Sequence, residues 1–187
     1  MRSVTTFDWY LIRGTGVVTL ILFTLVVALG IATTKRLRIA RLPRFVTLAL
    51  HRNVSLLAAA FLGVHIVTSM LDSYAHVGLA QVFVPAGTTR YAAYLGLGAL
   101  SFDMIVALVV TSLVRHRLTQ RVWKGVHWLG YASWPVALTH AVGVGTDSAS
   151  RWLSTVCIAC AGLVGATIAW RLLELRRPYP KYLGAAS

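Results

Sequence analysis

The sequence predicts an all-α fold, an integral membrane bundle of five transmembrane helices that forms a single domain over residues 1–187. The first reason is composition, because 57% of the residues are hydrophobic and only 12% are charged, whereas a soluble domain carries about 25% charged residues. The mean hydropathy of +0.72 agrees with this. The second reason is length, because five apolar runs have about 20 residues each, which a helix needs to cross a bilayer. We therefore expect lipid to surround much of the chain.

The five runs follow one another along the chain with short connectors. The first is long, lacks a small-residue cleavage site and is followed by basic residues, so we interpret it as an uncleaved span and not as a signal peptide. The connector over residues 72–91 contains Pro85 and Gly87, and it is predicted to be an external loop. The predicted spans cover approximately residues 10–33, 46–71, 92–113, 123–144 and 152–169.

The distribution of charge predicts the orientation of the bundle. The chain has 18 Lys and Arg against 5 Asp and Glu, a net charge of +13, which by itself would suit a nucleic-acid binder. Fourteen of the basic residues, however, lie in or beside the connectors after the first and third spans or at the C-terminal end. Because positive charge marks cytoplasmic connectors, the N-terminus is predicted outside and the C-terminus in the cytoplasm. We expect a multi-pass protein of the cell membrane, of the bacterial inner-membrane type, that contacts anionic lipid and no nucleic acid.

Four of the six histidines lie inside predicted spans, where polar side chains are costly and indicate function. His51 and His65 lie fourteen positions apart in the second span, and His127 and His140 lie thirteen positions apart in the fourth. These separations correspond to ~21 and ~20 Å along a helix. Both spans run outward from the cytoplasm, so His51 pairs with His127 near the cytoplasm and His65 pairs with His140 near the outer surface. Two facing imidazoles are a suitable axial ligand pair for a haem iron.

The angular positions of these side chains around their helices support the pairing less well than their depths do. Fourteen steps at ~100° each return His65 to within ~40° of His51, so one helix face serves both positions. Thirteen steps leave His140 ~140° away from His127 on an ideal helix. Pro135 lies between these two histidines, and we expect it to kink or rewind the helix.

The segments HRNVSLLAAAFLGVH (51–65) and HWLGYASWPVALTH (127–140) resemble the ferric reductase-like transmembrane family, which includes NADPH oxidases, ferric reductases and the bacterial MsrQ haem proteins. The resemblance implies two b-type haems held between two helices, each of which gives one iron ligand to each haem. The sequence shows no GxGxxG in a strand-to-helix context. We therefore expect electrons to come from a separate cytoplasmic flavoprotein or from a membrane quinol, through a partner's flavin or through the quinone itself.

Three cations are candidate partners of the haem propionates, which are anions. Arg52 and Lys124 flank the inner histidine pair, although membrane topology alone explains them equally well. Arg13 is more informative, because it interrupts an apolar run on the side where positive charge is scarce.

Four further residues have two possible interpretations each. Trp134 lies halfway between His127 and His140 and is a candidate for packing between the haem edges, or else is an ordinary packing residue. Asp103 is a candidate for proton movement or for pairing with Arg13, or is a buried neutral carboxyl. Cys157 and Cys160 share one face of the fifth span and are interpreted as small packing residues, with redox chemistry as the alternative.

The resulting hypothesis is a dihaem b-type cytochrome that carries electrons from the cytoplasmic side to an external acceptor, as the electron-transfer component of an oxidoreductase. One alternative is a non-redox transporter that uses its histidines to bind Zn or Cu. The ~20 Å between histidines of one helix disfavours it, because one metal ion needs its ligands within ~2 Å. A second alternative is an anchor subunit of a larger complex, in which removal of a histidine would leave function intact.

Overall fold

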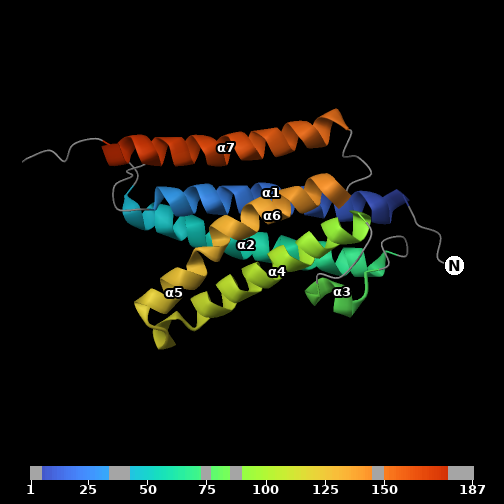
Figure 1. Cartoon of the computed structure of the whole chain (residues 1–187), viewed down its shortest axis with the longest axis horizontal. Helices are drawn as coiled ribbons and strands as arrows, with labels where there is room; N and C mark the ends of the chain where they lie inside the picture. Colours follow the sequence, from blue (N-terminus) through green and yellow to red (C-terminus); the bar gives the residue numbers. More distant parts are fainter. Residues whose placement is uncertain (1–5, 34–42, 73–76, 85–89, 145–149, 177–187) are drawn as a thin grey trace, which may run out of the picture.

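The computed structural model describes residues 6–33, 43–72, 77–84, 90–144 and 150–176, and every regular element in these ranges is a helix. The long helices lie beside one another, with α1, α4 and α7 running in one direction and α2 in the opposite one (Figure 1). They are α1 (Thr6–Ala32), α2 (Arg44–Leu71), α4 (Arg90–Leu113) and α7 (Arg151–Arg176). The shorter elements are α3 (Leu79–Phe83), the 3₁₀ turn η1 (Arg115–Arg117), α5 (Gln120–His127) and α6 (Leu129–Val144).

The four long helices are long and apolar enough to cross a membrane. They correspond to the first, second, third and fifth predicted spans, so the prediction of an all-α, multi-pass membrane protein is confirmed. Helix α2 is the least enclosed of them, because only 6% of its apolar stretch is buried inside the protein. Its exposed leucines and valines form a face suited to lipid.

The fourth predicted span is divided into α5 and α6 at Trp128. The Trp128 N–H is shared between the Lys124 carbonyl at 3.1 Å and the Gly125 carbonyl at 3.3 Å, and the Tyr131 N–H donates to the Trp128 carbonyl at 3.0 Å. Bonds between residues three apart belong to a tightened 3₁₀ turn and interrupt the α-helical pattern. Helix α6 alone has 16 residues, which is short for a span.

The interruption is not at the residue where the sequence placed it. Pro135 was expected to kink or rewind this helix, but α6 continues through Pro135. The change of direction instead occurs at Trp128, between Gly125 and Gly130, and glycines weaken a helix by about 1 kcal/mol each relative to alanine.

A short helix occupies part of the connector that was predicted to be a loop. The Gly78 N–H donates to Gln81 Oε1 at 3.1 Å at the start of α3. Val82 is buried, and the rings of Phe83 and Phe102 lie 5.5 Å apart, which attaches α3 to α4. Hydrophobic contacts to a neighbouring helix thus order a short segment that has no helical signal of its own.

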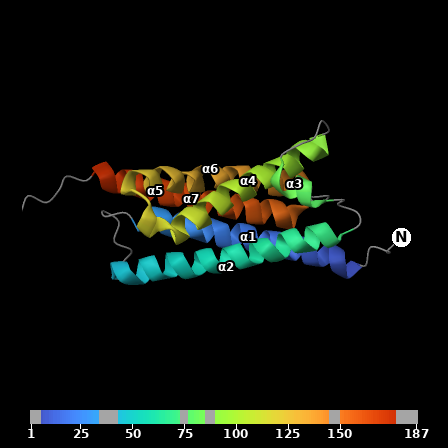
Figure 2. The same ribbon diagram turned by 90° about the horizontal axis from the view of Figure 1, so that it is seen from below.

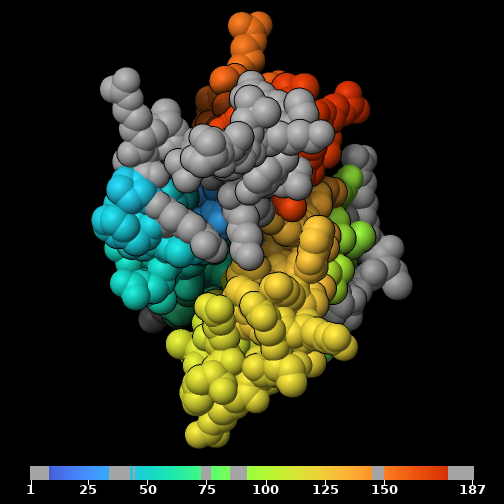
Figure 3. Space-filling view, turned by 90° about the vertical axis from the view of Figure 1, so that its left-hand side faces the viewer, coloured from blue at the N-terminus to red at the C-terminus, as the bar shows by residue number. Residues whose placement is uncertain are grey.

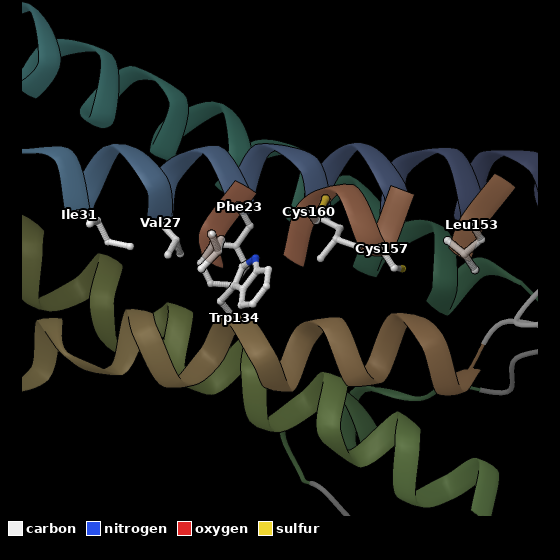
Figure 4. Packing of buried hydrophobic residues seen from close by; sticks show 9 residues of the cluster. Phe23, Val27, Ile31, Trp134, Leu153, Cys157 and Cys160 are labelled. Atoms are coloured by element: carbon white, nitrogen blue, oxygen red, sulfur yellow. The ribbon is translucent and has the colours of Figure 1, made fainter. Parts of the chain in front are cut away.

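The long helices pack as two hairpins joined by α7. Helix α2 packs along α1, and α6 packs along α4, whereas α2 has no extensive packing with α4 or α6 among the described residues (Figures 1 and 2). Helix α7 lies against α1 and α6. The core lies where these three helices meet (Figure 4), and it consists of Leu20, Phe23, Val27, Ile31, Trp134, Leu153, Cys157, Cys160 and Val164.

Candidate functional site

The four histidines of the predicted spans come together as two pairs at opposite ends of α2. The rings of His51 and His127 lie 6.3 Å apart between centroids, inclined at 68°. His65 and His140 line one cavity. These are the pairs that the directions of the spans predict. We call His65 and His140 the outer pair, and His51 and His127 the inner pair.

Three of these imidazoles are hydrogen-bonded through Nδ1 to a backbone carbonyl of the neighbouring helix in their own hairpin. A carbonyl oxygen can only accept, so Nδ1 must carry the proton, and the neutral ring keeps its lone pair on Nε2. A second partner of this kind is typical of histidines that bind metals. The Nδ1–O distances are 3.1 Å from His51 to Val26, 3.2 Å from His65 to Ile12 and 2.9 Å from His140 to Tyr94.

Both histidines of the outer pair line a cavity of about 640 Å³. This volume is typical of ligand and cofactor pockets. Its walls come from α1, α2, α4, α6 and the start of α7, and they are mostly apolar. Arg13 lies on this wall, with its guanidinium carbon 3.9 Å from the centroid of the Trp9 ring. The cavity therefore combines two imidazoles, an apolar lining and one arginine.

The inner pair has different neighbours. The rings of His127 and Trp123 are stacked, with their centroids 4.8 Å apart and their planes inclined at 24°. The guanidinium carbon of Arg115 lies over the Trp123 ring, 4.3 Å from its centroid. His127 Nδ1 and Trp123 Nε1 are buried without a hydrogen-bond partner among the described residues. Buried polar atoms normally have partners, so these two atoms mark a place where a bound group or water would be accommodated.

Trp123 and Arg115 are site residues that were not predicted from the sequence. One signal was available for Trp123, because a residue four positions before His127 on a helix lies beside it. No such signal existed for Arg115, which lies in the 3₁₀ turn before α5 and comes close only because the chain turns there.

The remaining candidates lie away from the cavity. Arg52 and Lys124 are exposed at the inner end of the molecule. Trp134 is only 8% exposed and donates from Nε1 to Thr24 Oγ1 at 3.0 Å, so its position favours the packing interpretation. Asp103 is half-buried on α4. Cys157 and Cys160 are buried free thiols in the same core as Trp134 (Figure 4).

Within the described ranges, no three histidine, cysteine or acidic side chains gather where they could hold a metal ion. The histidines gather in twos, which is the number of axial ligands that a haem iron takes from a protein.

Comparison with known proteins gives one family. The model of the ferric reductase like transmembrane component matches residues 15–138, which is more than half of the chain. The match includes His51, His65 and His127 and ends just before His140. No curated protein and no solved structure gave a match.

Proposed function

Because the chain belongs to the ferric reductase-like transmembrane family, we propose that it is a cytochrome b that holds two haems and carries electrons across the membrane. The observation that supports this most strongly is the presence of two histidine pairs at opposite ends of α2, three of whose rings donate through Nδ1 and so keep Nε2 for a metal. A membrane role in electron transfer follows from the family itself.

The residues present fit haem. His65 and His140 would hold the outer haem and His51 and His127 the inner one, and a bound haem iron gains or loses one electron at a time. The cavity beside the outer pair and the unpartnered Nδ1 of His127 support both assignments.

The other side chains would insulate the haems and orient them. The apolar side chains of the bundle exclude water, so the interaction between two charges is stronger there than at the surface. Arg13 on the cavity wall would bind a propionate by a charge-assisted hydrogen bond. Arg52 and Lys124 would do so at the inner end, or would contact headgroups.

We further propose that α5 and α6 together form the fourth of five crossings. Residues 120–144 rise about 37 Å at about 1.5 Å per residue, which exceeds a hydrocarbon core of about 30 Å. At the end of the molecule that faces the viewer in Figure 3, the segment from the end of α4 through η1 to α5 (yellow) protrudes to one side, and it exposes Arg115, Arg117, Arg121 and Lys124. Under the positive-inside rule this end is cytoplasmic, with the N-terminus outside.

The inner pair would then receive electrons from a cytoplasmic flavoprotein or a membrane quinol, and the outer pair would pass them to an external acceptor. Flavin or quinone would belong to these partners, and the membrane lipid would surround the bundle.

The test is the haem content of the purified protein. We expect two haems per chain, released by acidified solvent because no covalent attachment motif exists, with the absorption spectrum of a b-type cytochrome on reduction. His116→Ala is the matched control, because His116 is an exposed histidine of the 3₁₀ turn, and it should retain both haems. A haem content near zero in the wild type would overturn the proposal.

A further inference from the structure

Three histidines of the two pairs rest against neighbouring helices in the same way. The ring donates to a carbonyl, and it also lies over a glycine four positions further along that helix. We call this arrangement a carbonyl–glycine notch. The notches are Ile12 with Gly16 for His65, Val26 with Gly30 for His51, and Tyr94 with Gly98 for His140.

The glycine is needed because of where its side chain would be. Residues four apart lie on one face of a helix, one above the other, so a ring that reaches a carbonyl passes through the space of the side chain one turn later. A Cβ added at Gly98 would lie 2.6 Å from His140 Nδ1, and one at Gly16 would lie 3.0 Å from His65 Cε1. At Gly30 the distance to His51 Cε1 would be 3.4 Å, which is close to an ordinary van der Waals contact, so an added Cβ would crowd His51 little. Two carbon atoms prefer about 3.5–4.0 Å.

The carbonyl can serve both partners. Its oxygen has two lone pairs, so it accepts the helical N–H and also the imidazole N–H. The notch therefore leaves the helix intact.

The fourth histidine, His127, has no such notch among the described residues, and its Nδ1 has no hydrogen-bond partner there. Helix α4 runs antiparallel to α6, and thirteen positions separate His127 from His140. Counted forward from Gly98, the same thirteen positions lead to Thr111 and not to a glycine. The Thr111 hydroxyl donates to the Ala107 carbonyl at 2.6 Å.

We propose that Gly16 and Gly98 are positioning residues for the haem ligands His65 and His140, and that Gly30 leaves the corresponding room beside His51. Each glycine lets Nδ1–H of its histidine reach the carbonyl, which fixes the plane of the ring and its tautomer and leaves the lone pair on Nε2 for the iron. This inference rests on the proposed function. A ligand held by such a bond is also a stronger electron donor to the metal, so the notch influences the reduction potential as well as the affinity.

The test compares alanine substitutions with a matched control on the same helix. A Cβ at Gly14 would meet nothing within 4 Å, so Gly14→Ala has the same change in helix propensity as Gly16→Ala without the contact. We measure haem per chain, the electron paramagnetic resonance of the ferric protein, which reports the relative orientation of the two ligand rings, and both reduction potentials.

We expect effects that follow the distances. Gly98→Ala should weaken binding of the outer haem tenfold or more, as the loss of an outer-shell partner does at other metal sites. Gly16→Ala should alter the resonance and potential of the outer haem, whereas Gly30→Ala, whose Cβ would be close to ordinary contact distance, should alter those of the inner haem little. Gly14→Ala should match the wild type. A resonance and a potential unchanged in Gly16→Ala would overturn the inference, even if Gly98→Ala failed to fold.

A second measurement separates this inference from the proposed function. In haem-free protein labelled with ¹⁵N-histidine, nuclear magnetic resonance should show His51, His65 and His140 with the proton on Nδ1, and Gly16→Ala should remove this state from His65. Wild type that binds no haem but shows these tautomers would overturn the function and leave the notches standing. Wild type with two haems and Nε2-protonated rings in the haem-free state would overturn the notches alone.

Discussion

The outer and inner pairs both consist of histidines, but the surrounding helices fix the two pairs to different degrees. Both outer rings donate to a carbonyl and lie over a glycine, and both belong to helices, α2 and α6, that pack along their partners. In the inner pair only His51 is held this way. His127 is at the end of the short helix α5, before the interruption at Trp128, and its contact is a stack on Trp123.

The difference indicates that the two sites have different tasks. A ligand that is fixed by its surroundings lowers the cost of binding and sets one geometry, which suits the outer pair. A ligand on a short helix joined by a 3₁₀ turn can change its position without disturbing the core. We expect the inner site to be the more adjustable one, at the end where an electron donor must approach.

The largest effects should come from removing ligands. His65→Ala or His140→Ala should remove the outer haem, and His51→Ala or His127→Ala the inner haem, each leaving about one haem of two. Pyridine haemochrome assay and redox titration of the remaining haem would measure this. If His51→Ala and His140→Ala removed the same haem, the pairs and the direction of the fourth span would be wrong.

The next effect should be confined to the inner site. Trp123→Leu removes the ring that supports His127, and an aromatic contact contributes about 0.5–1.5 kcal/mol beyond its area. The inner haem should therefore bind up to about tenfold more weakly, while the outer haem is unchanged. Haem transfer to apomyoglobin would measure the loss. Trp128→Leu is the control, because Trp128 is 63% exposed, and an equal loss in both variants would contradict the role of the stack.

A smaller effect should be confined to the outer site. Arg13→Ala removes a cation from the cavity wall, which makes the electron-rich ferrous state less favourable. The outer haem's potential should fall by up to about 60 mV, a tenfold change for one electron, with both ligands retained. Redox titration decides this, with the exposed Arg52→Ala as comparison. Unchanged potentials in Arg13→Ala would assign this residue to the headgroup boundary or to a pair with Asp103.

The smallest effect on haem should come from Trp134. Trp134→Phe keeps an aromatic ring in the core but loses the bond to Thr24, which should cost about 1–2 kcal/mol of stability. Both haem spectra and potentials should stay as in the wild type. Thermal unfolding and redox titration together test this, and a shifted potential would return Trp134 to the cofactor site.

The sequence was sufficient for the pairing of the histidines but not for their surroundings. Pairing depends on span directions and on the closely matched intervals between the two histidines of each span, which are both visible in the sequence. The interruption at Trp128 depends on local 3₁₀ bonds, and α3 depends on tertiary contacts of Val82 and Phe83. Neither the interruption nor α3 has a periodic sequence pattern from which it could be predicted.

One signal of the notches was nevertheless present. The interval from Gly16 to Gly30 equals the interval from His51 to His65, and the two helices are antiparallel neighbours. For α4 the corresponding signal is broken, because Thr111 replaces the second glycine. A single glycine in a span has many explanations, so only the matched spacing distinguishes Gly16 and Gly30 from Gly14.

The arrangement of the hairpins also has a consequence for biosynthesis. Each hydrogen-bonded histidine is held by the helix that precedes it in its own hairpin: α1 holds both histidines of α2, and α4 holds His140 of α6. Helices are made in chain order, and units made first can fold first. The first hairpin can therefore orient His51 and His65 before the ribosome has made the second. Haem loading would then meet ligands already oriented for it, whereas the two hairpins are joined by the core of α1, α6 and α7. A chain deprived of haem should therefore still assemble both hairpins in the membrane and stay ready to bind haem afterwards.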